Sequence, residues 1–123
     1  QLQGTDDTPG IVLDAANNKF EISGRSLPED VNSFYSPILE WLDTYRKNPN
    51  DKTVFEFNLT YFNTASSKIL LDILMKLDEM HDEGQDVLIK WYFPDDDEDM
   101  QEAGEEYEEM VDVPFEHISY QDD

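Results

Sequence analysis

The chain has 123 residues, of which 30 are Asp or Glu and 8 are Lys or Arg, giving a formal net charge of -22 at pH 7. This charge repels nucleic-acid phosphates and anionic lipid headgroups, which argues against nucleic acid and membranes as partners. Because the chain contains no Cys, disulfides, thiolate catalysis and Cys-ligated metal centres are excluded.

Length and composition predict one small domain. Apolar residues make up 38% of the chain and aromatic residues 12%, enough for a single hydrophobic core. No apolar run approaches the roughly 20 residues that span a bilayer, and no signal segment is present, so we expect a cytoplasmic protein. We expect the domain to cover residues 9–120, between a flexible segment at 1–8 and a short tail at 121–123.

The first elements should form a β-hairpin. Ile11–Asp14 and Lys19–Ser23 have the character of short strands. Residues 15–18, Ala-Ala-Asn-Asn, provide turn chemistry between them. The pair should therefore be antiparallel.

A helix should follow the hairpin. Ser26 and Glu29 have the spacing of a capping box, and Pro28 is tolerated in a first helical turn. Pro37 is expected to kink the helix. Apolar residues then recur every three or four positions, at Val31, Phe34, Tyr35, Ile38, Leu42 and Tyr45.

Two strands flank a second helix. Val54–Leu59 alternates apolar and polar residues, as a strand with one buried face does. The helix should begin at Asn63, run to about Glu83 and end at Gly84, which suits a left-handed cap. Val87–Phe93 is apolar on both faces, which predicts a central strand.

The remaining segments complete an α/β fold. Pro94 and the acidic run 95–99 should form a loop, Gln101–Val111 a short helix and Phe115–Tyr120 a last strand. Strand-helix-strand units favour parallel neighbours joined by right-handed crossovers. We therefore predict a mixed sheet of about five strands, covered by two long helices and one short helix.

Three segments should meet where parallel strands end, namely Gly24–Pro28, Tyr61–Lys68 and Pro94–Asp99. Residues 63–68 open the second helix, where unpaired amides and the helix dipole favour an anion. Alternatively, Asn63 or Thr64 simply caps that helix.

The acidic run allows several interpretations. Asp95, Asp97, Asp99 and Glu106 have the spacing of ligands in a calcium loop, but Met100 stands where such a loop needs Gly. The run could instead be solvated, or pair with Arg25. His81 and His117 have no third ligand or nucleophile at a suitable spacing. We therefore predict neither an enzyme nor a cofactor.

Three stretches resemble one protein family. They are ISGRSLPE at 22–29, YFNTASSK at 61–68 and WYFPDDDEDM at 91–100. Together, in this order and spacing, they resemble the SiaC family of bacterial regulatory phosphoproteins. The resemblance runs from about Pro9 to Ile118. It implies a domain similar to STAS domains, in which a Ser or Thr at this helix start is phosphorylated.

The resemblance implies Thr64 as the phosphorylated residue. The family usually has Ser at the position of Ala65, which leaves Ser66 as the second choice. It also implies a cognate Ser/Thr protein kinase, a metal-dependent Ser/Thr phosphatase, and an effector such as a diguanylate cyclase, bound by the unmodified form. Control of cyclic-di-GMP and biofilm formation would follow.

Partner contacts should gather around the same edge. Arg25, Asn63 and Lys68 match family positions there. The complete predicted partner-binding set is Arg25, Asn63, Thr64, Ser66, Ser67, Lys68, Asp95, Asp96 and Asp97. A constitutive acidic interaction module, independent of phosphorylation, is the alternative to this switch.

Overall fold

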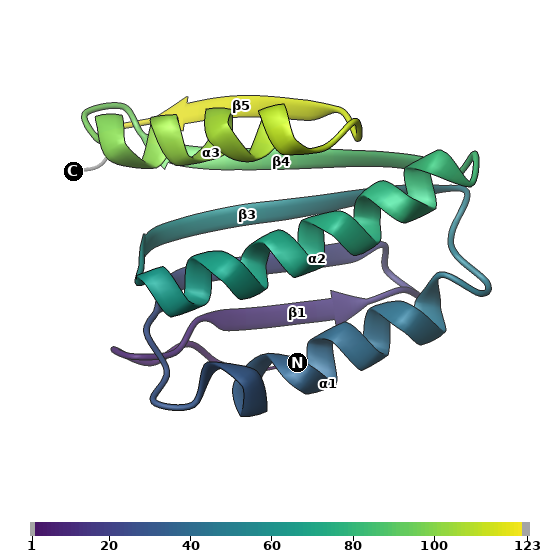
Figure 1. Cartoon of the computed structure of the whole chain (residues 1–123), viewed down its shortest axis with the longest axis horizontal. Helices are drawn as coiled ribbons and strands as arrows, with labels where there is room; N and C mark the ends of the chain where they lie inside the picture. Colours follow the sequence, from purple (N-terminus) through teal and green to yellow (C-terminus); the bar gives the residue numbers. More distant parts are fainter. Residues whose placement is uncertain (1, 122–123) are drawn as a thin grey trace.

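The computed structural model describes residues 2–121, which form one five-stranded sheet and three helices (Figure 1). The strand order is β1-β2-β3-β4-β5, so every strand lies beside its neighbour in the sequence. The elements are β1 Gly10–Asp14, β2 Lys19–Ser26, α1 Val31–Tyr45, β3 Lys52–Phe62, α2 Thr64–Asp82, β4 Asp86–Pro94, α3 Glu98–Met110 and β5 Phe115–Tyr120.

The topology confirms the predicted mixed sheet. β1 and β2 are antiparallel, whereas β2, β3, β4 and β5 are mutually parallel. The three crossovers all step in the same direction along the sheet, and crossovers of one hand then place their helices on the same face. The helices lie together on that face in Figure 1. The opposite face is covered by no helix of the described chain.

The core lies between the helices and the sheet. Alternate residues of each inner strand point into it, so Phe55, Phe57 and Trp91 are almost fully buried. On the helix-free face, Glu56 accepts hydrogen bonds from Lys19 at 3.0 Å and from Tyr92 at 2.9 Å. In the strand order, β4 is an internal strand, as its apolar composition predicted, but the central strand is β3.

The start of α1 differs from the prediction. Asp30 is the N-cap, and its Oδ1 accepts a hydrogen bond from Ser33 N at 3.1 Å. Ser26 instead ends β2, because pairing with β3 extends to Ser26 opposite Phe62. The predicted capping box was therefore wrong, and the helix continues through Pro37.

The start of α3 also differs. The helix begins at Glu98, three residues earlier than predicted, and Asp97 caps it by accepting from Met100 N at 3.0 Å. Acidic residues in a first turn are stabilised by the positive end of the helix dipole. The predicted acidic loop is correspondingly shorter.

The N-terminal segment makes defined contacts. Leu2 exchanges two backbone hydrogen bonds with Ile11, at 2.8 and 2.9 Å, and Asp7 O accepts from Leu27 N at 2.8 Å. The segment predicted for 1–8 therefore contacts the rest of the domain through Leu2 and Asp7; Gln1 and residues 122–123 lie outside the described residues. Within residues 2–121, no helix has the length and apolar character needed to cross a membrane.

Candidate functional site

The three predicted loops meet at the edge where β2, β3 and β4 end. Asn63 is the N-cap of α2, and its Oδ1 accepts a hydrogen bond from Ser66 N at 2.8 Å. Asn63 N in turn donates to Ser26 O at 3.2 Å. The end of β2 therefore fixes the place where α2 begins.

Thr64 is the first residue of α2, and its side chain is exposed. The first amides of a helix have no intrahelical acceptor, and the dipole is positive there. Thr64 O accepts the Ser67 hydroxyl at 2.7 Å. Thr64 thus presents an accessible hydroxyl beside groups that stabilise an anion.

Ser66 is buried, unlike Thr64. It has an exposed fraction of 0%, and its hydroxyl donates to Ser26 O at 2.9 Å. Ser26 Oγ donates to Ser66 Oγ at 2.9 Å, so the Tyr35 hydroxyl, 2.6 Å from Ser26 Oγ, must be the donor of that pair. The position of Ser66 therefore argues against its predicted roles as second phosphorylation choice and partner contact.

The buried hydroxyl chain is a feature that sequence reasoning missed. Burial raises the pKa of Tyr35, and the hydrogen bond with Ser26 opposes this effect. These three hydroxyls join β2, α1 and α2, and Ser66 lies 40 positions after Ser26 in the sequence. No local pattern signals such a contact.

Two basic side chains, Arg25 and Lys68, lie near this edge. Arg25 is exposed; its Nε donates to Asp6 O at 3.1 Å, and its Cζ lies 5.4 Å from the ring centroid of Tyr61. Lys68 is exposed one helical turn after Thr64. Among the described residues, Arg25 forms no ion pair with the acidic run, so that interpretation is not supported.

The acidic run divides into two parts. Asp95 and Asp96 are exposed, as expected of a solvated run. Asp97 is half-buried and uses its carboxylate to cap α3, while Asp99 and Glu106 lie within the helix. A calcium loop would need these three residues to wrap around one ion, which a cap and a continuous helix prevent.

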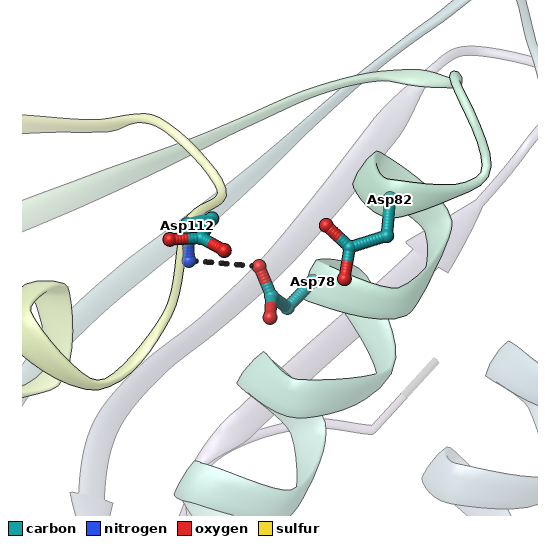
Figure 2. Close-up of side chains that lie close together, drawn as sticks. All are labelled: Asp78, Asp82 and Asp112. Carbon is teal, nitrogen blue, oxygen red and sulfur yellow. Dashed lines mark hydrogen bonds between the residues drawn. The ribbon is translucent and has the colours of Figure 1, made fainter.

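A different acidic cluster does form. Asp78 and Asp82 project from α2 toward Asp112 in the turn before β5 (Figure 2), with candidate ligand oxygens within 4.8 Å of one another. Asp78 Oδ1 accepts from Asp112 N and Val113 N, both at 2.9 Å. The Asp78 carboxylate therefore holds the backbone of residues 112 and 113 in place. The linear spacing of these residues did not predict this contact.

The chain matches a known protein family along almost its whole length. A family model described as SiaC family regulatory phosphoprotein matches residues 2–120. An uncharacterized protein of Pseudomonas aeruginosa (strain UCBPP-PA14) is 29% identical over 114 residues, covering 93% of this chain and 90% of that protein.

Solved structures agree with the family match. SiaC of Pseudomonas aeruginosa, in complex with the diguanylate cyclase SiaD that it activates, is similar with a TM-score of 0.90 and 28% identity. The match covers 95% of this chain and 96% of that one. SiaC of Pseudomonas aeruginosa in a second structure gives a TM-score of 0.88 and 27% identity, over 97% of this chain and 96% of that one.

Proposed function

The chain belongs to the SiaC family of regulatory phosphoproteins, and from that premise we propose that it is a non-enzymatic partner switch controlled by reversible phosphorylation of Thr64. The unmodified form binds and regulates an effector protein such as a diguanylate cyclase. A cognate Ser/Thr protein kinase adds the phosphate, which releases the effector. A metal-dependent Ser/Thr phosphatase removes it.

The exposure of Thr64 at the start of α2 is the observation that carries this proposal. A phosphate there adds about -1.5 to -2 charges at pH 7. The helix amides and dipole stabilise such a group by about 0.3–1 kcal/mol. Ser66 is fully buried, which leaves Thr64 as the accessible residue of the two predicted acceptors.

The choice of effector rests on similarity. SiaC of Pseudomonas aeruginosa forms a complex with the diguanylate cyclase SiaD, and its fold matches this chain over nearly its whole length. An effector of the same class is therefore the first partner to test.

The experiment has two stages. First, intact-mass spectrometry after incubation with the cognate kinase should show one added phosphoryl group on the wild type and none on Thr64→Ala. Ser67→Ala, which removes a neighbouring hydroxyl, should be phosphorylated like the wild type. Second, effector binding should persist in Thr64→Ala and be lost in Thr64→Asp. Equal binding by all forms would refute the switch.

The alternative is a constitutive acidic module, which would bind its partner through exposed carboxylates such as those of Asp95 and Asp96. Under that alternative, Asp95→Asn/Asp96→Asn would abolish effector binding, whereas Thr64→Asp would have no effect. The switch predicts a larger effect of Thr64→Asp than of the loop variant.

A further inference from the structure

The sheet divides between β3 and β4. Pairing of these two strands ends where Phe57 lies opposite Trp91. β4 then continues beside β5 as far as Pro94, whereas residues 58–62 of β3 have no partner in β4. In Figure 1 the two strands diverge toward their carboxyl ends. Residues 58–62 therefore present a strand edge on the side that faces β4, here called the β3 edge.

The last part of the β3 edge has unpaired backbone groups. Asn63 N donates to Ser26 O of β2, and the backbone groups of successive strand residues point to opposite sides, so those of Phe62 point away from β2. Within residues 2–121, no hydrogen bond satisfies the Phe62 N–H or C=O. Thr60 has no opposite residue in β2 and forms a bulge, a feature common next to functional sites. Backbone groups so placed need water or a partner strand.

A hollow opens beside the β3 edge. Its volume is about 310 Å³, and it lies between the end of β3 and the start of α3. The register of β3 and β4, continued beyond Phe57, would place Pro94 opposite Thr60, so β3 extends past the end of β4. Tyr61 in this extension is 46% exposed. Apolar surface in the hollow comes from Tyr61, Phe62, Met100 and Ala103.

The α3 side of the hollow is acidic. Asp97 and Asp99 line it, and none of the described residues that line it is Lys or Arg. Opposite charges attract and like charges repel across an interface, so this side favours a partner segment that carries Lys or Arg.

We propose that the β3 edge binds a short extended segment of the effector, which adds to β3 as a further strand. The segment carries apolar side chains that enter the hollow and basic side chains long enough to reach Asp97 and Asp99. This inference rests on the proposed docking of an effector and specifies the conformation and chemistry of the docked segment. An extended segment offers free N–H and C=O groups to Phe62, whereas a helix has already paired its own.

The β3 edge differs from the outer edges of the sheet. β1 is bridged by the chain itself, since Leu2 and Ile11 exchange backbone hydrogen bonds at 2.8 and 2.9 Å. β5 is the last strand, so its outer edge is the competing place for an added strand. No β5 residue lines the hollow. Binding at the β3 edge should therefore depend on the hollow, and binding at β5 should not.

Two peptides of about eight residues, with equal Leu and Lys content, provide the probe. One alternates Leu and Lys, the pattern of a strand, and the other spaces Leu at the period of a helix. Fluorescence anisotropy at physiological salt should show at least about tenfold tighter binding of the alternating peptide. Absence of binding, or equal or tighter binding of the helical pattern, overturns the proposal.

Two N-methylated forms of the alternating peptide test the backbone hydrogen bonds. One form is methylated on the amides of odd residues and the other on those of even residues, so their charges are equal. A strand directs alternate amides to one neighbour. One form should therefore bind at least about tenfold more weakly than the parent peptide, and the other within about threefold of it. Equal affinities of the two forms overturn the proposal.

The matched variants Ala103→Leu and Ala16→Leu locate the peptide. Ala103 lines the hollow, whereas Ala16 is exposed in the turn between β1 and β2. Ala103→Leu fills the hollow and should weaken binding of the alternating peptide at least about tenfold, whereas Ala16→Leu should bind within about twofold of the wild type. Thermal unfolding verifies that each variant is folded. Equal affinity of the two folded variants overturns the proposal.

Amide hydrogen exchange in the wild type gives a second measurement of the position. The Phe62 N–H should exchange at least about tenfold more slowly in the complex, because an added strand bonds it. Slower exchange confined to β5, or to the surface of α3, overturns the proposal.

The failures of the two proposals are distinguishable, although Thr64 lies only two positions after Phe62. If Ala103→Leu weakens effector binding while Thr64→Asp does not, the β3 edge stands as the docking site and the phosphorylation switch fails. If Thr64→Asp releases the effector while folded Ala103→Leu binds it normally, the switch stands and the β3 edge is overturned.

Discussion

Replacement of Gly104 by Ala tests how α3 packs on the sheet. Gly104 is buried in the middle of α3, directly over the indole of Trp91. A Cβ added at Gly104 would lie 2.6 Å from Trp91 Nε1 and 2.8 Å from Trp91 Cγ, where ordinary contacts begin at 3.4 Å. Either α3 or the ring must move to accommodate a methyl group.

The ring has little freedom to move. Trp91 is 1% exposed, its Nε1 donates to Met100 O at 3.0 Å, and its ring centroid lies 5.7 Å from that of Phe57 and 5.5 Å from that of Tyr107. Overpacking at such a site costs about 1–3 kcal/mol. Higher helix propensity returns about 1 kcal/mol. With the ring held on several sides, we expect Gly104→Ala to lower the free energy of unfolding by about 1–2 kcal/mol.

The sign of the change in the free energy of unfolding shows whether steric crowding or helix propensity prevails. Urea denaturation measures the free energy of unfolding, and near-UV circular dichroism reports the tryptophan environment. Glu105→Ala, on the exposed side of the same helix, is the control and should change stability by less than about 0.5 kcal/mol. If Gly104→Ala were more stable than the wild type by about 1 kcal/mol, helix propensity would have prevailed and the close packing described above would be refuted.

Two further predictions concern the acidic side chains. Asp78→Ala removes two hydrogen bonds from the segment before β5 and should lower the free energy of unfolding, measured in urea, by about 1–2 kcal/mol. Asp82→Ala, an exposed neighbour, should change it by less than about 0.5 kcal/mol. Equal effects of the two variants would show that Asp78 does not hold this segment in place. Burial raises the pKa of Glu56, but hydrogen bonds from Lys19 and Tyr92 outweigh it and leave the pKa below the ordinary value of 4.5. A carboxylate with a lowered pKa in the folded state contributes stability at neutral pH, and this contribution is lost as the pH falls below the ordinary pKa and then through the lowered one. Glu56→Gln should therefore lose less stability in acid than the wild type does, by a difference of less than about 1 kcal/mol. Identical pH dependence of stability in the two proteins would contradict this.

Local patterns in the sequence determined most of the elements. The alternation in β3 and the apolar period of α2 predicted both, and the structure extends β3 to Lys52–Phe62 and confirms α2 within a residue at each end. Gly84 has a φ of +92°, as the predicted left-handed cap requires. These features depend on neighbours within one turn or on simple burial, so the linear sequence specifies them.

Tertiary contacts decided the rest. Ser26 has the spacing of a helix cap, yet strand pairing with β3 carries it into the core, where it bonds Ser66 across 40 positions of sequence, and Asp30 takes the cap. The same contact buries Ser66 and leaves Thr64 as the exposed hydroxyl. A propensity of about 1 kcal/mol for one cap over another is smaller than the burial and sheet pairing that fix where a strand ends, so local spacing could not settle these positions.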